Sequence, residues 1–163
     1  MPADDVTTTV PVRLDFESHA PEVYKALLRV DRAAREQLER VGFDSRLSEL
    51  VRVRASQLNG CAYCIDMHTK DARRVGETEQ RLYALTAWRD TPFFTERERA
   101  ALAFTEAVTL MNIDHVPDEA YRAVSEHYDE DEIAALVGLI VAINAWNAIG
   151  VSLHAWVPGS YEG

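Results

Sequence analysis

The feature that most restricts the fold is an uncharged segment near the end of this 163-residue chain. From Ile133 to Leu153 no residue carries a charge, and a helix of this length could cross a bilayer. Asn144, Asn147 and Ser152 interrupt it, and no Lys or Arg follows it, whereas membrane spans usually have basic flanks. A helix that is apolar on all sides can equally lie in the core of a bundle. We therefore expect a buried helix that also contacts another subunit, and no membrane span.

The rest of the sequence predicts helices almost throughout and no period-two strand pattern. Proline in a first turn, glycine after a last turn and capping pairs mark the segment ends. Helices are expected from Pro21 to Gly42, from a Ser45 cap to Gly60, from about Ala62 to Val75, after a Thr95–Glu98 capping box, after Pro117, and from an Asp129 or Asp131 cap. This pattern predicts an all-α bundle of about six or seven helices. We expect residues 1–19 to be an extended lead-in and residues 20–163 to form one domain.

The net charge of −10, from 27 acidic and 17 basic residues, argues against two classes of partner. An acidic surface repels nucleic acid and anionic lipid, so neither is expected to bind. The N-terminus has no basic stretch followed by an apolar one, as a secretory signal would have. We therefore expect a cytoplasmic protein. Thiols stay reduced there, and a close cysteine pair is more often catalytic or metal-binding than structural.

The two cysteines lie three positions apart in the segment NGCAYCIDMHTKDA, residues 59–72. Gly60 lets the chain turn, so Cys61 is expected at the start of a helix, with Cys64 and His68 further along one face. The helix N-terminus favours a thiolate, the spacing allows a disulfide, and the imidazole can exchange a proton with Cys64. A thiol peroxidase needs these groups, because a thiolate attacks the peroxide and a second thiol resolves the sulfenic acid. The residues alone do not decide which cysteine attacks.

Two other interpretations of the cysteine pair stay open at this point. Free cysteines are among the most buried residue types, so the pair could be two core thiols. A structural zinc site needs four ligands, and Cys61, Cys64 and His68 supply three. No spacing selects the fourth ligand among the remaining candidates, which are His115, His127 and His154.

Glu49 lies twelve residues before Cys61, on the helix that precedes the Gly60 turn. If the two helices form a hairpin, Glu49 and His68 lie at comparable distances from the turn and can face each other. A carboxylate bound to the imidazole would select its tautomer and raise its basicity. The alternative is a solvated glutamate on a charged helix.

Four further polar residues are expected to have structural roles. Arg52 and Arg54 lie near Glu49, and we expect them to pair with carboxylates on the next helix. Asn144 and Asn147 lie in the apolar last segment, and buried amides need partners, so we expect hydrogen bonds across helices.

The run from Glu49 through RASQLNGCAYCIDMHTKDAR resembles the core motif of the alkyl hydroperoxidase D and carboxymuconolactone decarboxylase superfamily. In its peroxidase branch a glutamate stands twelve residues before a C-x-x-C-x-x-x-H motif. The chain matches this spacing at four positions, which are Glu49, Cys61, Cys64 and His68. Residues 76–110 are also similar to the segment that follows the motif, and the likeness covers about residues 20 to 155.

The resemblance implies an all-helical homotrimer or homohexamer that reduces small organic hydroperoxides. It implies that Cys64 becomes the sulfenic acid, that Cys61 donates a proton and resolves it, and that Glu49 and His68 relay protons. It implies no metal, haem or flavin cofactor, and an unidentified thiol or dithiol must reduce the disulfide. Two alternatives stay open: a redox-sensing or interaction protein with little turnover, and a lactone decarboxylase. The decarboxylase branch generally lacks the cysteine pair.

One position departs from the family pattern. In the best-studied peroxidase members a histidine stands immediately before the second cysteine, and here that residue is Tyr63. A phenol with an ordinary pKa of about 10 is a poor base at neutral pH, although it can form a hydrogen bond. We therefore expect a simpler proton relay and slower turnover than in those relatives.

Overall fold

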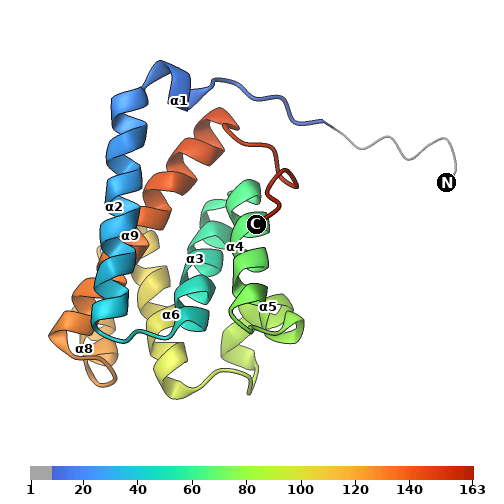
Figure 1. Ribbon diagram of the computed structural model, residues 1–163. Coiled ribbons are helices and arrows are strands. Elements are labelled where there is room, and N and C mark those ends of the chain that lie inside the picture. The colour runs from blue at the N-terminus through green and yellow to red at the C-terminus, as the bar shows by residue number, and fades with distance from the viewer. Residues whose placement is uncertain (1–8) are drawn as a thin grey trace, which may run out of the picture.

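The computed structural model describes residues 9–163, and all regular secondary structure in that range is helical (Figure 1). The described residues form nine α-helices and one 3₁₀-helix, η1. They are α1 (Phe16–His19), α2 (Pro21–Arg40), α3 (Ser45–Asn59), α4 (Ala62–Arg74), α5 (Glu79–Ala84), η1 (Leu85–Asp90), α6 (Glu96–Thr109), α7 (Met111–Asp114), α8 (Asp118–Ser125) and α9 (Glu130–Leu153). The predicted all-α fold class is confirmed. The predicted number of helices is too low, because α1 and α7 are single turns too short to show a periodic pattern.

The prediction of an extended lead-in over residues 1–19 is wrong at its C-terminal end. Residues 16–19 form α1, because the carboxylate of Asp15 accepts a hydrogen bond from the backbone N–H of Ser18 and caps the turn. The segment just before α1 is anchored to α9, since the Arg13 N–H donates to the Leu153 carbonyl over 2.8 Å. Residues 1–8 of the predicted lead-in lie outside the described residues.

Side chains cap half of the ten helix starts among the described residues. Asp44, not Ser45, caps α3, because its carboxylate accepts from two backbone N–H groups of the first turn. The predicted capping box of Thr95 and Glu98 is confirmed at α6. Asp129, the first of the two predicted caps, opens α9 with a second capping box.

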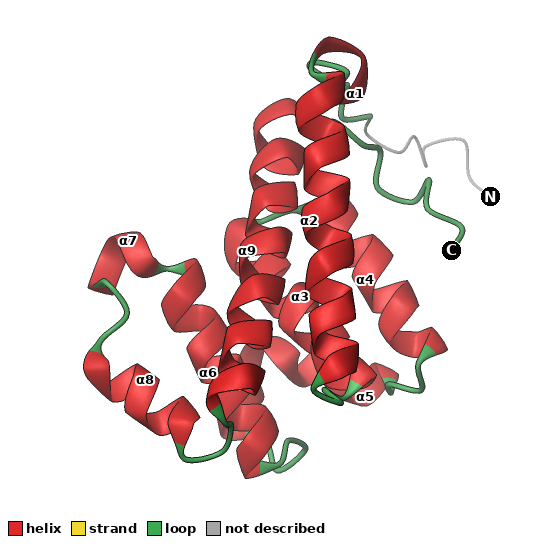
Figure 2. Cartoon of the chain, turned by 60° about the vertical axis from the view of Figure 1, so that its left-hand side comes forward, coloured by secondary structure: helices red, strands yellow, loops and turns green. Residues whose placement is uncertain are grey.

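Helices α3 and α9 lie at the centre of the bundle (Figures 1 and 2). Helix α9 packs against α2 and α3, with α4 and α6 also in contact, and Leu136, Leu139 and Ile140 are fully buried. Among the described residues, α9 alone is long and apolar enough to span a membrane, and 44% of its most apolar window is buried by its neighbours. Its position is therefore that of a core helix, as its lack of charge predicts. Contact with another subunit stays a prediction.

Candidate active site

A tight turn between α3 and α4 positions both cysteines. Gly60 ends α3 in the left-handed conformation, with φ 71° and ψ 29°, which glycine adopts at little cost. The Cys61 N–H then donates to the Ser56 carbonyl over 3.0 Å, so the chain reverses and α4 runs back along α3. Cys61 is the N-cap residue of α4, and Cys64 lies in the first turn of that helix.

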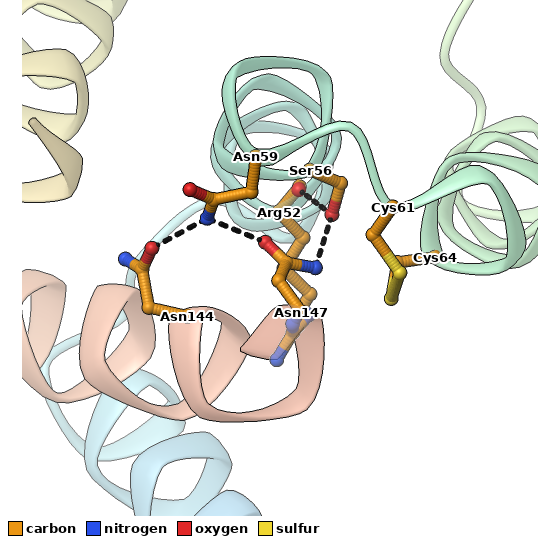
Figure 3. Close-up of a disulfide and its surroundings, with 7 residues drawn as sticks. All are labelled: Arg52, Ser56, Asn59, Cys61, Cys64, Asn144 and Asn147. Carbon is orange, nitrogen blue, oxygen red and sulfur yellow. Dashed lines mark hydrogen bonds between the residues drawn. A yellow bond between two sulfur atoms is a disulfide. The ribbon is translucent and has the colours of Figure 1, made fainter. Parts of the chain in front are cut away.

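The two sulfur atoms are joined in a disulfide in this structure (Figure 3). The Cα atoms of Cys61 and Cys64 lie 5.3 Å apart, as the spacing of three residues at a helix start allows. Both residues are almost fully buried, at 2% and 4% exposure. The chain is therefore in its oxidised form, and any reactant must reach the sulfurs through cavities.

The structure brings Glu49 and His68 together across the helix pair. The Nδ1 atom of His68 lies 2.9 Å from Oε2 of Glu49, and both side chains are buried. Since an ionised carboxylate can only accept, Nδ1 carries the hydrogen and donates it. This tautomer leaves Nε2 as the basic nitrogen of His68.

A buried arginine keeps Glu49 in its charged form. Burial by itself would raise the pKa of Glu49, but the hydrogen bond from His68 and the positive charge of Arg52 outweigh it, and the pKa lies below its ordinary value of 4.5. Arg52 donates from Nη1 to Oε1 of Glu49, so the two carboxylate oxygens serve two different partners. Glu49 is therefore an ionised orienting group for the imidazole at neutral pH.

The predicted partners of the two arginines are wrong. Arg52 pairs with Glu49 within α3, because residues three apart on a helix share a face. Arg54 points the other way and donates from Nε to Glu106 on α6 over 2.8 Å. Neither arginine pairs with a carboxylate of α4, since the i,i+3 partner and the α6 carboxylate lie closer in the packed bundle.

A cavity of about 150 Å³ borders Cys64 and His68, and we call it the His68 cavity. Its other lining residues come from α2, α4, α9 and the C-terminal segment; they are Tyr24, Leu28, Tyr63, Met67, Trp146 and Trp156. Four of these are aromatic and contact one another in series, with ring centroids 5.5 to 5.9 Å apart. The result is an apolar chamber with a sulfur atom and an imidazole in its wall.

Tyr63 packs as part of this aromatic wall. Its ring lies 5.5 Å from that of Trp156. Burial raises the pKa of the Tyr63 phenol, so it stays neutral at physiological pH. A neutral phenol can donate a hydrogen bond but is a poor base at that pH.

An amide network fastens α9 to the turn that carries the cysteines (Figure 3). The Nδ2 atom of Asn59 donates to Oδ1 of Asn144 over 2.6 Å and to Oδ1 of Asn147 over 3.0 Å. Asn147 in turn donates to the Ser56 hydroxyl over 3.0 Å, and that hydroxyl donates to the Arg52 carbonyl. The predicted structural role of Asn144 and Asn147 is confirmed.

One group of possible metal ligands includes the imidazole of His68. Ligand atoms of Glu49, His68 and Asp71 lie within 4.8 Å of one another. The Glu49 oxygens already accept from His68 and Arg52, and one Asp71 oxygen accepts from Tyr161 and Arg74 over 2.8 Å each. We interpret the group as a hydrogen-bonded cluster. A zinc site on the cysteines would require them as thiolates, and in this oxidised form both sulfurs are bonded to each other.

The sequence motif contains only part of the site. Three of the four aromatic side chains in the wall of the His68 cavity lie far from the motif along the chain: Tyr24, Trp146 and Trp156. Trp156 belongs to a C-terminal segment held on α4, where Lys70 donates to the Tyr161 carbonyl over 2.8 Å. The available signal was the density of aromatic residues near the end of the chain, and it did not indicate which cavity they line.

Comparisons with known proteins agree with the motif. A model of the carboxymuconolactone decarboxylase family matches residues 21–107. The uncharacterized protein YdfG of Bacillus subtilis (strain 168) is 43% identical over 141 residues, which are 86% of this chain and 93% of YdfG. Because this relative is itself uncharacterized, the likeness assigns no activity to the chain.

Two solved structures share the fold. A protein of unknown function from Agrobacterium tumefaciens, for which a role in antioxidant defence as an AhpD protein has been suggested, has a TM-score of 0.84 and 34% identity. The match covers 91% of this chain and 99% of that one. An uncharacterized peroxidase-related protein from Ralstonia eutropha JMP134, with an alkylhydroperoxidase AhpD core, has a TM-score of 0.75 and 18% identity over 88% of this chain and 74% of that one. The second likeness concerns the fold alone.

Proposed function

Because this chain belongs to the carboxymuconolactone decarboxylase family, and because it carries a close cysteine pair, we propose that it is a thiol-dependent peroxidase. It reduces small organic hydroperoxides through a dithiol–disulfide cycle of Cys61 and Cys64, with a proton relay of His68 and Glu49. The observation that carries this proposal is the shared cavity of Cys64 and His68, in which the imidazole is oriented by a buried carboxylate.

The first half of the cycle oxidises Cys64. His68 takes the proton of the Cys64 thiol at Nε2, and Glu49 stabilises the imidazolium that forms. The thiolate attacks the terminal oxygen of the hydroperoxide, the O–O bond breaks, and the departing alkoxide takes the proton back from His68. The products are an alcohol and the sulfenic acid of Cys64.

The second half forms the disulfide. The Cys61 sulfur attacks the sulfenic sulfur of Cys64, the S–O bond breaks, and the hydroxide leaves as water with the proton of the Cys61 thiol. The 5.3 Å between the two Cα atoms lets this bond form without unwinding α4. An external thiol or dithiol then restores both thiols by exchange. No step in this cycle requires a metal, haem or flavin.

The aromatic wall favours an apolar peroxide. Four aromatic side chains surround the space next to Cys64, so a bulky organic group gains contact area that hydrogen peroxide lacks. We expect an aralkyl hydroperoxide such as cumene hydroperoxide to have a kcat/KM at least about 10-fold higher than hydrogen peroxide, which corresponds to about 1.4 kcal/mol of apolar contact.

An assay of thiol-dependent peroxide consumption tests the proposal. We expect the wild-type protein to consume cumene hydroperoxide catalytically with dithiothreitol as reductant, measured as peroxide lost per protein over time. Absence of thiol-dependent consumption would contradict the proposed function. Consumption of one equivalent without further turnover would also contradict it, and would favour the redox-sensing alternative.

Removal of the Tyr63 hydroxyl is expected to have a small effect. Because the phenol is neutral and serves at most as a hydrogen-bond donor, Tyr63→Phe should keep kcat/KM for cumene hydroperoxide within about 5-fold of wild type. Tyr63→Ala, which also removes the contact with Trp156, is the matched comparison and should lose more. A loss of 100-fold or more in the phenylalanine variant would instead make Tyr63 part of the proton relay, roughly the size of a general acid–base contribution.

Two further proposals concern the assembly of the protein and its location. We propose that the chain assembles into a homotrimer or homohexamer and acts in the cytoplasm. Exposed apolar residues on α2 and α9, including Val23, Leu28 and Val141, are the surface available for such an assembly.

A further inference from the structure

The disulfide borders a second cavity, on the Cys61 side. This cavity has a volume of about 160 Å³, and we call it the His154 cavity. Its lining includes Cys61, Gly60, Gly150 and His154, whereas Cys64 and His68 line the His68 cavity. Tyr63 and Trp156 line both cavities and so form the wall between them. Each sulfur of the disulfide therefore borders a cavity of its own, and each cavity contains one histidine.

The approach of α9 to Cys61 depends on a glycine. A Cβ atom at Gly150 would lie 2.8 Å from the Cys61 sulfur, closer than such contacts allow. Because position 150 carries no side chain, the Cys61 sulfur fits against α9 next to the cavity. This close approach brings the last turn of α9, and with it His154, to the Cys61 side of the disulfide.

His154 is held in an unusual state at the end of α9. Its backbone is in the left-handed region, with φ 46° and ψ 43°, which is uncommon for a residue other than glycine and often marks functional positions. Its Nδ1 atom is buried, and no group among the described residues forms a hydrogen bond with it. A buried nitrogen without a partner costs free energy, so its presence needs an explanation. The residue as a whole is only partly buried, and it lines the same cavity as Cys61.

We propose that His154 is the proton-transfer group for the reductive half of the cycle, and that the reducing thiol reaches Cys61 through the His154 cavity. This inference rests on the proposed dithiol cycle and assigns its two reactants to different cavities. The peroxide meets Cys64 beside His68, and the reductant meets Cys61 beside His154.

The chemistry balances with a dithiol reductant. His154 accepts the proton of the first incoming thiol, whose thiolate attacks the Cys61 sulfur. The Cys61–Cys64 bond breaks, and its electron pair goes to Cys64, whose thiolate is next to His68. The second thiol of the reductant gives its proton to the Cys64 thiolate by way of His68, and its sulfur attacks the reductant sulfur of the mixed disulfide. The Cys61 sulfur leaves with the electron pair and takes the proton from His154, so the reductant becomes a disulfide and both cysteines are reduced.

The test measures the two half-reactions separately in His154→Gly. Glycine suits the left-handed backbone at this position, so the variant should fold. The disulfide is preformed with diamide, and its reduction by dithiothreitol is followed by alkylation and mass spectrometry, with no peroxide present. We expect reduction about 100-fold slower than in wild type, the size of a general acid–base contribution. Added imidazole should enter the enlarged cavity and restore most of the rate, while oxidation of the reduced protein by cumene hydroperoxide should stay within about 3-fold.

His115→Gly is the matched control. His115 also ends a helix in the left-handed region, with φ 49°, but it is exposed and lines neither cavity. We expect this variant to behave like wild type with and without imidazole. A wild-type reduction rate in His154→Gly, a slower rate that imidazole does not restore, or an equal loss in both half-reactions would each overturn the proposal. Because the disulfide is made with diamide, a protein that fails to turn over peroxide still gives a result for His154.

Discussion

Replacement of Cys64 by serine is expected to lower thiol-dependent consumption of cumene hydroperoxide by about 10³-fold or more. A serine hydroxyl stays protonated beside His68 and cannot form a sulfenic acid, so the O–O bond is not attacked. The measurement is the initial rate of peroxide loss with dithiothreitol, in parallel with wild type. Unchanged activity in Cys64→Ser would remove Cys64 from the mechanism.

Cys61→Ser is the matched variant that separates the roles of the two sulfurs. It keeps Cys64 beside His68 and loses only the resolving thiol, so it should consume one equivalent of peroxide rapidly and leave a sulfenic acid on Cys64. Trapping with dimedone and mass spectrometry locates that group. A rapid single equivalent in Cys64→Ser, with none in Cys61→Ser, would reverse the assignment of the two cysteines.

Replacement of Glu49 by glutamine is expected to destabilise the protein by about 3 kcal/mol or more. The substitution keeps the shape of the side chain but leaves the buried charge of Arg52 without its partner. It also weakens the acceptor that fixes the tautomer of His68, so kcat should fall together with stability. Chemical denaturation followed by circular dichroism measures the first effect, and the peroxide assay measures the second.

The double variant Glu49→Gln/Arg52→Met separates stability from catalysis. Because it removes both buried charges, it should recover most of the lost free energy of unfolding while activity stays low. If activity returns together with stability, Glu49 has only a structural role. If Glu49→Gln is as stable as wild type, the charge pair contributes little to folding.

The same carboxylate predicts how the difference between wild type and Glu49→Gln depends on pH. The folded-state pKa of Glu49 lies below its ordinary value of 4.5, so the folded state favours the charged form. The stabilisation is therefore fully present above about pH 4.5 and is lost as the pH falls through the lower, folded-state pKa. Denaturation of both proteins across this acid range should show the difference in stability shrinking as the pH falls. A constant difference would contradict the ionised state assigned to Glu49.

Much of the site could be predicted from local spacing along the chain. Gly60 lies between two helical patterns and predicts a hairpin of the helices that the structure labels α3 and α4. This hairpin alone, without the other helices of the bundle, is enough to predict that Glu49 lies opposite His68, as the structure has it. The three-residue spacing of Cys61 and Cys64 at a helix start brings the two sulfurs within bonding reach. Where a predicted helix boundary was wrong, the competing choice was local: Asp44 in place of Ser45 as a cap, and a single turn after Asp15. The wrong partner predicted for Arg54 was not local, because Glu106 lies on α6 and reaches Arg54 only in the packed bundle.

The sequence by itself determined that residues 133–153 form a helix shielded from water, because a helix without a charged or polar face is unfavourable in solvent, and the interrupting amides and missing basic flanks favoured a protein core over a bilayer. Only the tertiary structure decided which residues of that helix lie next to the cysteines. Its packing angle places Gly150 against the Cys61 sulfur and His154 in one cavity, with Trp146 in the other. These contacts join residues some ninety positions apart, and they depend on how side chains of several helices interdigitate, which no periodicity along the chain specifies.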